Sequence, residues 1–323
     1  MAELLYRTSI FAELPNWSDP VELTVRHQVA VIVPCFNEQD AIARTIRELR
    51  AALHILDGYE LIVIDDGSTD GTAAILKDEQ RSDPSLRVIS HARNRGYGAA
   101  LKTGIRASRG ELVVITDADG TYPNHRLQNL IQLAANADMV VGARTADDVE
   151  YPFIRRLPKL FLQAYARWIA QTDIPDLNSG MRVLRRSVVE RFLNILPDGF
   201  SFTTTITLAL LTNRYIVQYV PISYAARIGT SKIRPIRDTA KFFQLVLRTG
   251  MYFAPLRVYG PMLWLMFLAF VASICYDVLV LEDLTEKTLL LMILFINSTM
   301  FALLADMIDK RSTRERREAP LQK

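Results

Sequence analysis

The sequence predicts an α/β domain with a mostly parallel sheet and helices on both faces, followed by an amphipathic helix and a two-helix membrane hairpin. Two observations lead to this fold class. Up to about residue 143, short apolar β-branched runs alternate with helix-compatible stretches, which is typical of a parallel sheet covered on both faces. After residue 257, the chain contains two long apolar stretches.

The first half of the domain alternates five expected strands with four expected helices. The strands are Val29–Val33, Leu61–Ile64, Leu86–Ile89, Leu112–Ile115 and Met139–Val141. The helices are Asp40–Leu56, Thr72–Arg81, Gly98–Ala107 and Asn124–Asn136, and Asp70 and Asn124 stand at helix-capping positions. Ligands of such sheets bind beyond the carboxyl ends of the strands, so functional residues should follow the strands.

The second half of the domain continues with less regular elements. Helices are expected at 155–171, Ser187–Leu196 and Thr203–Asn213, and strands at Met181–Leu184 and Ile216–Val220. Residues 1–27 lack a basic region followed by an apolar region, so we expect an arm lying on the domain or the membrane rather than a signal peptide.

The C-terminal part is expected to bind and cross a membrane. Ile236–Phe253 has an apolar face and a basic face, as in helices at a membrane interface, although an ordinary domain helix remains an alternative. Val258–Leu281 is about 36 Å long as a helix, enough for the ~30 Å hydrocarbon core. Leu289–Ile308 is a second apolar stretch, and a buried soluble hairpin is the alternative interpretation.

The distribution of charge predicts the orientation of the hairpin. Lysines and arginines precede the first span and follow the second, whereas the connection Glu282–Thr288 is acidic apart from Lys287. The positive-inside rule then places the large domain and both termini in the cytoplasm. The expected organisation is an arm (1–27), the α/β domain (28–230), a juxtamembrane helix (231–256), two transmembrane helices (257–309) and a basic cytoplasmic tail (310–323).

Net charge and cysteine content add two further expectations. The net charge of +3 gives no indication of nucleic-acid binding. Cys35 and Cys275 have neither pairing nor metal-site spacing, which fits a reducing compartment.

Polar motifs follow the first two strands. Asp65 and Asp66 directly follow the second strand and could accept hydrogen bonds from a nucleobase and a ribose, while Gly67 allows a sharp turn. A helix cap and a loop are the alternative interpretation. After the first strand, Pro34 is expected to end the strand, and Asn37 and Glu38 to open the next helix or contact a donor.

Asp117-Ala118-Asp119 follows the fourth strand and is the strongest candidate for a metal site. Alternate residues there put two carboxylates at one sheet edge, where a shared cation offsets their repulsion. Oxygen ligands suit Mg²⁺ or Mn²⁺ rather than zinc, although solvated loop acids are the alternative. A fourth motif, Arg93–Gly98, follows the third strand; its glycines could let a ligand approach, and its arginines could face phosphate.

These four motifs, in this order, resemble the glycosyltransferase family 2 domain, which has a GT-A fold. The resemblance runs from about Val29 to Tyr224 and extends to Gly142-Ala143-Arg144 and to Asp176–Arg182. It is closest to the polyprenyl-phosphate glycosyltransferases, meaning the dolichol-phosphate mannose or glucose synthase-like group. It implies a nucleotide-sugar donor of the GDP-mannose or UDP-glucose type, a polyprenyl or dolichyl phosphate acceptor, and a homo-oligomer as one option.

The resemblance also implies residue roles. The nucleotide-sugar site would comprise Pro34, Asn37, Glu38, Asp65, Asp66, Gly67, Asp117 and Ala118. The metal ligands would be Asp117 and Asp119, and the acceptor-phosphate site would comprise Arg144, Ser179, Arg182, Arg227 and Lys232. The catalytic set is then Asp119, Asp117, Asp176 and Arg144, in which Asp176 is either a residual base or orients the sugar or an arginine. Thr121 stands where some mannose synthase-like members have a glutamine ligand.

The expected reaction needs no strong base. Many family members have a carboxylate near the start of the later helix, but Ser201–Thr205 contains no acid. A lipid phosphate is already anionic near neutral pH, so it needs cations rather than deprotonation. We therefore expect a single inverting displacement. A hydroxyl acceptor, a catalytically silent nucleotide-sugar-binding scaffold and a nucleotidyltransferase remain alternatives.

Overall fold

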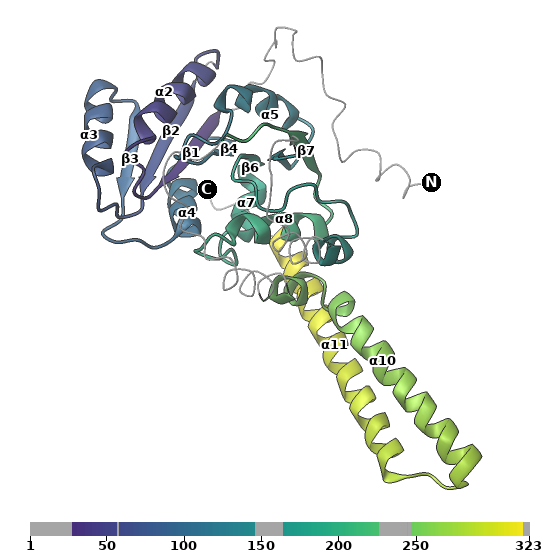
Figure 1. Cartoon of the computed structure of the whole chain (residues 1–323). Helices are drawn as coiled ribbons and strands as arrows, with labels where there is room; N and C mark the ends of the chain where they lie inside the picture. The colour runs from purple at the N-terminus through teal and green to yellow at the C-terminus, as the bar shows by residue number, and fades with distance from the viewer. Residues whose placement is uncertain (1–27, 57, 146–163, 226–243, 245–246, 319–323) are drawn as a thin grey trace.

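The computed structural model describes residues 28–56, 58–145, 164–225, 244 and 247–318, with side chains as far as residue 311 (Figure 1). The expected arm at 1–27 lies outside the described residues, as does most of the expected interfacial helix. What is described consists of an α/β domain and a helical hairpin that projects from it (Figure 1).

The domain is built on a seven-stranded mixed sheet. The strands are β1 (Val29–Cys35), β2 (Tyr59–Asp65), β3 (Leu86–Ser90), β4 (Leu112–Ile115), β5 (Met139–Ala143), β6 (Arg182–Arg185) and β7 (Val217–Pro221), and their spatial order is β3-β2-β1-β4-β6-β5-β7. Strand β6 runs antiparallel to both of its neighbours, and the other described pairs are parallel. The prediction of a mostly parallel sheet is confirmed.

Helices cover both faces of this sheet. The helices of the domain include α2 (Ile42–Leu53), α3 (Thr72–Ser82), α4 (Tyr97–Ala107), η1 (Asn124–Arg126), α5 (Leu127–Leu133), α7 (Arg186–Phe192) and α8 (Phe202–Thr212). Residues 164–170, the described part of the helix expected at 155–171, are helical as well. Side chains of β1 alternate between two cores. Val31 and Val33 pack with α2 and α5, whereas Ile32 packs with α4 and α8. Burial on both faces explains why the strand sequences are continuously apolar.

Two local expectations are wrong. Strand β1 continues through Pro34, which pairs with Ile64 of β2. Its pairing with β4 extends only to Ile32, so the ladder on that side does not require an N–H at Pro34. Asn124 is not a helix cap. It is 2% exposed, its Oδ1 accepts a hydrogen bond from Thr116 Oγ1 (2.9 Å), and its Nδ2 donates to Glu48 (3.2 Å).

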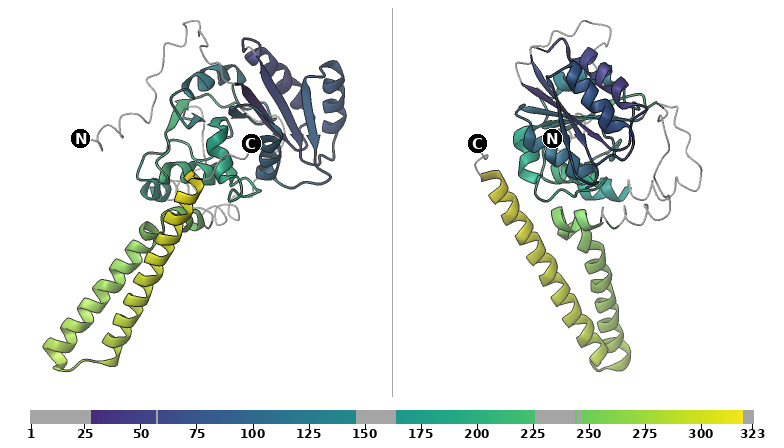
Figure 2. Two further views of the ribbon diagram at one scale, coloured as in Figure 1. Left: turned by 180° about the vertical axis from the view of Figure 1, so that it is seen from behind. Right: turned by 90° about the vertical axis from the view of Figure 1, so that its left-hand side faces the viewer.

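The hairpin comprises α10 (Pro255–Tyr276), which continues as a π-helical turn (η2, Asp277–Leu281), and α11 (Glu286–Glu318). The helical stretches Pro255–Leu281 and Glu286–Arg311 are long and apolar enough to cross a membrane, and only 11% of the apolar window of each is buried. They are therefore not core helices of a soluble domain. Figure 2 shows the two helices meeting at the connecting loop, far from the sheet.

The beginning of the hairpin packs onto the domain. Phe253 is 6% exposed, and its ring lies 6.3 Å from that of Phe192 on α7. Arg257 donates a hydrogen bond to the carbonyl of Ile169. The arrows of β2 and β3 point toward the side from which the hairpin projects (Figure 1). The carboxyl ends of the strands, where ligands bind in such sheets, therefore face the hairpin side.

Candidate active site

The loops after β1 and β2 are tied together by side chains of the predicted donor site. Asn37 has a φ of 56°, and its Oδ1 accepts a hydrogen bond from Thr69 N (2.8 Å). The backbone N–H of Asn37 donates to Ser68 Oγ (3.0 Å), and that of Glu38 donates to Thr72 Oγ1 (2.9 Å). The two loops therefore form one structural unit, and contact of Asn37 and Glu38 with a donor stays a prediction.

Asp66 organises the loop after β3. Its Oδ1 accepts a hydrogen bond from Arg95 N (2.9 Å), and its Oδ2 accepts one from Gly96 N (2.8 Å). His91 Nδ1 lies 2.6 Å from Asp66 Oδ1. Because Asp66 is only 3% exposed, its carboxylate shapes the site through these contacts, and any direct contact with a donor stays a prediction.

Gly67 is required where two loops cross. Its φ is +72°, and a Cβ there would lie 2.5 Å from the carbonyl carbon of Arg93. Any side chain would therefore separate the loops after β2 and β3. Asp65, also 3% exposed, accepts a hydrogen bond from Ser68 N (3.0 Å) and so closes the same turn.

Asp117 is held from two sides. Tyr97 Oη, at the start of α4, donates a hydrogen bond to Asp117 Oδ1 (2.9 Å). The backbone of Gly180 lies against the same carboxylate, since a Cβ at Gly180 would be 2.6 Å from Asp117 Oδ2. Burial and the neighbouring Asp117 charge raise the pKa of Tyr97, so its hydroxyl remains a donor at physiological pH.

Asp119 and Ala118 are fixed by neighbouring threonines. Asp119 is 7% exposed, and its Oδ1 accepts hydrogen bonds from Thr121 Oγ1 (2.6 Å) and Thr121 N (3.2 Å). Thr121 thus orients Asp119. The carbonyl of Ala118 accepts a hydrogen bond from Thr45 Oγ1 of α2 (3.0 Å), which pins the turn after β4.

The carboxylates of this turn fit a divalent cation that takes other ligands from water and substrate. Among the described residues, no group of three or more His, Cys, Asp or Glu side chains could hold a metal. Mg²⁺ and similar ions are commonly bound by one or two carboxylates together with substrate phosphates, rather than by a cage made only of protein. The donor set Asp117 and Asp119 is of this kind.

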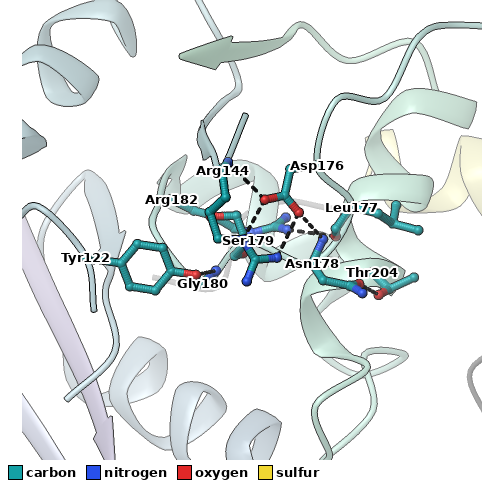
Figure 3. A network of polar contacts seen from close by, with 9 residues as sticks. All are labelled: Tyr122, Arg144, Asp176, Leu177, Asn178, Ser179, Gly180, Arg182 and Thr204. Atoms are coloured by element: carbon teal, nitrogen blue, oxygen red, sulfur yellow. Dashed lines mark hydrogen bonds and ion pairs between the residues drawn. The ribbon is translucent and has the colours of Figure 1, made fainter. Parts of the chain in front are cut away.

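An ion pair lies between β5 and the loop before β6 (Figure 3). Arg144 Nε lies 2.7 Å from Asp176 Oδ2, and its Nη2 lies 2.9 Å from Oδ1. Asp176 also accepts hydrogen bonds from Arg144 N (3.1 Å) and Asn178 N (3.0 Å). Burial alone would raise the pKa of Asp176, but the bonds and charge of Arg144 outweigh it and lower the pKa. Asp176 therefore orients Arg144, and a role of Asp176 as a base stays a prediction.

Two tyrosines connect this ion pair with Asp117. The backbone N–H of Gly180 donates to Tyr122 Oη (2.6 Å), so Tyr122 fixes the glycine that touches Asp117 (Figure 3). The Tyr122 ring meets Tyr224 edge-on at 5.3 Å, and the Arg144 guanidinium lies 5.2 Å from the centroid of Tyr224. The predicted residues Asp117, Arg144 and Asp176 therefore belong to one connected network.

Arg182 has a different place from the one expected. It is 0% exposed and donates to the carbonyls of Ser179 (2.6 Å) and Leu177 (3.0 Å) and to Thr207 Oγ1 (2.6 Å). Burial lowers its pKa. These contacts argue against a direct bond to an acceptor phosphate. They make Arg182 a support for the loop that carries Asp176 and Ser179, and Ser179 is itself 0% exposed.

Two further expectations concern the acceptor site and the glycines after β3. Arg227 and Lys232 lie outside the described residues. The space beside Gly96 and Gly98 is occupied by protein, because a Cβ there would lie 2.5 Å from Asp198 O and 2.2 Å from Pro197 O, respectively. These glycines therefore allow α4 to approach the segment before α8 rather than a ligand.

Sequence reasoning assigned no role to three aromatic residues, Tyr97, Tyr122 and Tyr224. Two of them stand inside or beside recognised motifs, since Tyr97 belongs to the motif after β3 and Tyr122 follows Asp119 closely. A tyrosine close to an acidic motif, such as Tyr122 after Asp119, could have indicated a site residue. A tyrosine within an apolar pattern also fits a core position, so the sequence alone does not decide between the two.

The chain is similar to characterised sugar transferases. It is 28% identical over 226 residues to the polyprenol monophosphomannose synthase of Mycolicibacterium smegmatis, covering 67% of this chain and 84% of that protein. It is 30% identical over 243 residues to the undecaprenyl-phosphate 4-deoxy-4-formamido-L-arabinose transferase of Pseudomonas aeruginosa, covering 71% of this chain and 67% of that protein.

A solved structure supports the fold. Glucosyl-3-phosphoglycerate synthase of Mycobacterium tuberculosis, in complex with Mn²⁺, UDP-glucose and phosphoglyceric acid, superposes with a TM-score of 0.54. The sequences are 18% identical, and the match covers 70% of this chain and 80% of that chain, so this likeness shows a shared GT-A-like fold. Residues 30–193 match the model described as glycosyl transferase family 2. With about half of its length matched by that model, the chain belongs to glycosyl transferase family 2.

Proposed function

We propose that this protein transfers a glycosyl residue from a nucleotide sugar to a polyprenyl phosphate at a membrane surface. One observation carries the proposal: the domain that holds Asp117 and Asp119 is joined to a hairpin of two helices able to cross a membrane, and the carboxyl ends of its strands lie on the side from which the hairpin projects (Figure 1). The names of the two relatives support it, since one is a polyprenol monophosphomannose synthase and the other an undecaprenyl-phosphate sugar transferase.

The donor side is assigned to the loops after β1, β2 and β4. Asn37, Glu38, Asp65 and Gly67 shape a rigid floor for the nucleoside, and Asp66 fixes the adjoining loop through Arg95 and Gly96. Such pre-organised polar groups lose little conformational entropy when they bind a ligand.

Asp117 and Asp119 are assigned to hold Mg²⁺ or Mn²⁺. When bound, such an ion stabilises the negative charge that develops on a departing nucleoside diphosphate. The chain contributes the geometry: Tyr97 Oη and Gly180 fix Asp117, and Thr121 fixes Asp119. The crystallised complex of glucosyl-3-phosphoglycerate synthase with Mn²⁺ supports this class of ion.

The acceptor side relies on cations. A phosphate monoester needs no deprotonation near neutral pH, which suits a site whose residual acid, Asp176, is paired with Arg144. The first turn of α8 also contains no acid. Arg144 is assigned to hold the acceptor phosphate, because a guanidinium suits phosphate geometry. The phosphate oxygen attacks the anomeric carbon from the face opposite the diphosphate, with inversion.

The domain and both termini are assigned to the cytoplasm. Basic residues flank the outer ends of both helices, and the loop between them is mostly acidic, as the positive-inside rule requires. The hairpin thereby confines the site and the lipid acceptor to one layer, which raises their effective concentration.

The test is a donor and acceptor survey with the purified full-length protein in vesicles. GDP-mannose, UDP-glucose and related donors are each supplied with undecaprenyl phosphate, and lipid products are identified by mass spectrometry. A lipid-linked sugar formed from at least one donor is expected. Transfer only to diacylglycerol or glycan hydroxyls, or the absence of donor turnover, would refute the proposal.

A further inference from the structure

One aromatic side chain of the domain faces solvent almost completely. Phe200, in the segment between α7 and α8, is 84% exposed, whereas Phe192 and Phe202 on either side are 2% and 0% exposed. A phenyl ring that is fixed in place while exposed to water offers a preformed apolar contact, because a partner that covers it removes apolar surface from water.

The ring of Phe200 is held in place. It stacks on Tyr97 with 5.5 Å between ring centroids and 18° between ring planes. Asp198, two residues before Phe200, is anchored to α4 as well. Its backbone oxygen accepts a hydrogen bond from Ala99 N (3.0 Å), and its Oδ1 pairs with Lys102 Nζ (2.8 Å). The close approach at Gly98 leaves no room for this segment to shift toward α4. Phe200 is therefore a pre-organised surface rather than the tip of a loose loop.

The position of Phe200 connects the reacting centre with the membrane side. Tyr97, on which Phe200 stacks, donates its hydroxyl to Asp117, so the ring pair extends outward from that carboxylate. In Figure 1, α7 and α8, which the segment joins, lie at the end of the domain that carries the hairpin.

We propose that Phe200, supported by Tyr97, binds the first isoprenoid units of the lipid acceptor. This inference rests on the proposed function. The parts of the donor that reach Asp117 are a diphosphate and a sugar, which are polar, whereas the group that follows the acceptor phosphate is a hydrocarbon. Contact with a fixed phenyl ring removes apolar surface of both partners from water. The ring thereby guides the phosphate end of the lipid from the membrane into the site.

The test compares Phe200→Ala with Phe200→Leu and with a matched control, Ile55→Ala. Ile55 is 41% exposed and lies between α2 and β2, at the opposite end of the strands. Two acceptors are used: undecaprenyl phosphate in vesicles, and geranyl phosphate in buffer without lipid. For Phe200→Ala, the KM for both acceptors should rise roughly tenfold, with the donor KM unchanged. Phe200→Leu should restore most of the affinity, and Ile55→Ala should behave as wild type.

Each other outcome overturns the inference in an identifiable way. A rise in KM for vesicle-borne acceptor alone would mean that Phe200 contacts the bilayer. A rise in donor KM would mean that it stacks on the sugar or the base. Unchanged kinetics in all variants would mean that the ring has no binding role. If the wild-type protein transfers sugar to neither acceptor, the proposed function itself fails.

Discussion

Asp119 is the residue whose loss should be most damaging to the reaction with least effect on the fold. We expect Asp119→Asn to lower kcat by about 10²–10³-fold, because the neutral amide removes a charge that binds the divalent ion. The amide oxygen can still accept the hydrogen bonds of Thr121, so the thermal unfolding midpoint should change little.

The matched control is Asp78→Asn, on the surface of α3, where the side chain of Asp78 is 72% exposed and pairs with Arg81. Steady-state rates at saturating donor and the binding of Mn²⁺ followed by electron paramagnetic resonance provide two independent readouts. Undiminished turnover of wild type in excess chelator would exclude the metal role.

Tyr97 is expected to tune the same site indirectly. Tyr97→Phe keeps the ring that stacks on Phe200 but deletes the hydroxyl that donates to Asp117. A hydrogen bond to a charged group contributes about 1.5–3 kcal/mol, so the Mn²⁺ concentration for half-maximal activity should rise at least tenfold. Rates at saturating Mn²⁺ should fall far less. An unchanged Mn²⁺ dependence would show that Asp117 needs no help from Tyr97.

The Arg144–Asp176 pair predicts a dependence of stability on pH. Because the pKa of Asp176 is lowered in the folded state, the pair stabilises the fold fully above the unfolded carboxyl pKa of about 3.9. This contribution is lost as the pH falls through the lower folded pKa. At neutral pH, Asp176→Asn should reduce the free energy of unfolding by about 2–3 kcal/mol, and the difference from wild type should shrink in acid.

Asp173→Asn is the control for this experiment, since Asp173 is 72% exposed and lies 3.6 Å from Arg167. Denaturant unfolding at several pH values separates the two variants. The same Asp176→Asn variant also tests whether Asp176 is a base. Residual transfer should keep the pH profile of wild type; disappearance of an acidic limb would assign Asp176 a proton-transfer role.

At the scale of elements, the contact between α4 and the segment before α8 depends on glycine. A Cβ at Gly98 would lie 2.2 Å from the backbone oxygen of Pro197, whereas the nearest contact of a Cβ at Gly199 is at 3.9 Å. Gly98→Ala should therefore destabilise the domain by about 1–3 kcal/mol and displace Tyr97 and Phe200. Gly199→Ala, on the other side of the same contact, should be close to neutral. Equal thermal stability of the two variants would contradict this packing.

The elements themselves were predictable because their periodicity is local. The strands β1 to β5 and the helices α2 to α4 are found within a few residues of the expected ranges. The direction of β6 is a different matter. It inserts between β4 and β5 and runs antiparallel to both, and its short sequence, Arg182-Val183-Leu184-Arg185, does not specify either direction. Pairing direction depends on tertiary connections rather than on the strand sequence.

The candidate site could be predicted only in part, because burial and contacts also depend on tertiary structure. Asp117 and Asp119 could be singled out because they follow a buried strand at a sheet edge, and their role as metal ligands stays a prediction. Arg182 was assigned to phosphate because it is a basic residue in a recognised motif, yet its contacts with Ser179, Leu177 and Thr207 lie inside the fold. Burial of a charged side chain depends on long-range packing that no local pattern records.

For the whole molecule, the length of α11 links the membrane to the domain. Its 33 residues extend about 50 Å at about 1.5 Å per residue, which exceeds the ~30 Å hydrocarbon core. The expected tail at 310–323 is therefore helical as far as Glu318. The part of α11 that exceeds this thickness lies at the domain end of the hairpin (Figure 1).

The central claim is that a lipid phosphate oxygen displaces a nucleoside diphosphate. The most direct measurement follows the nucleotide and lipid products of one incubation of wild-type protein with undecaprenyl phosphate and an active donor. The account predicts equal amounts of nucleoside diphosphate and of lipid monophosphate sugar. Release of nucleoside monophosphate with a lipid diphosphate sugar, or release of free diphosphate, would contradict it, because either requires attack at phosphorus instead of the anomeric carbon.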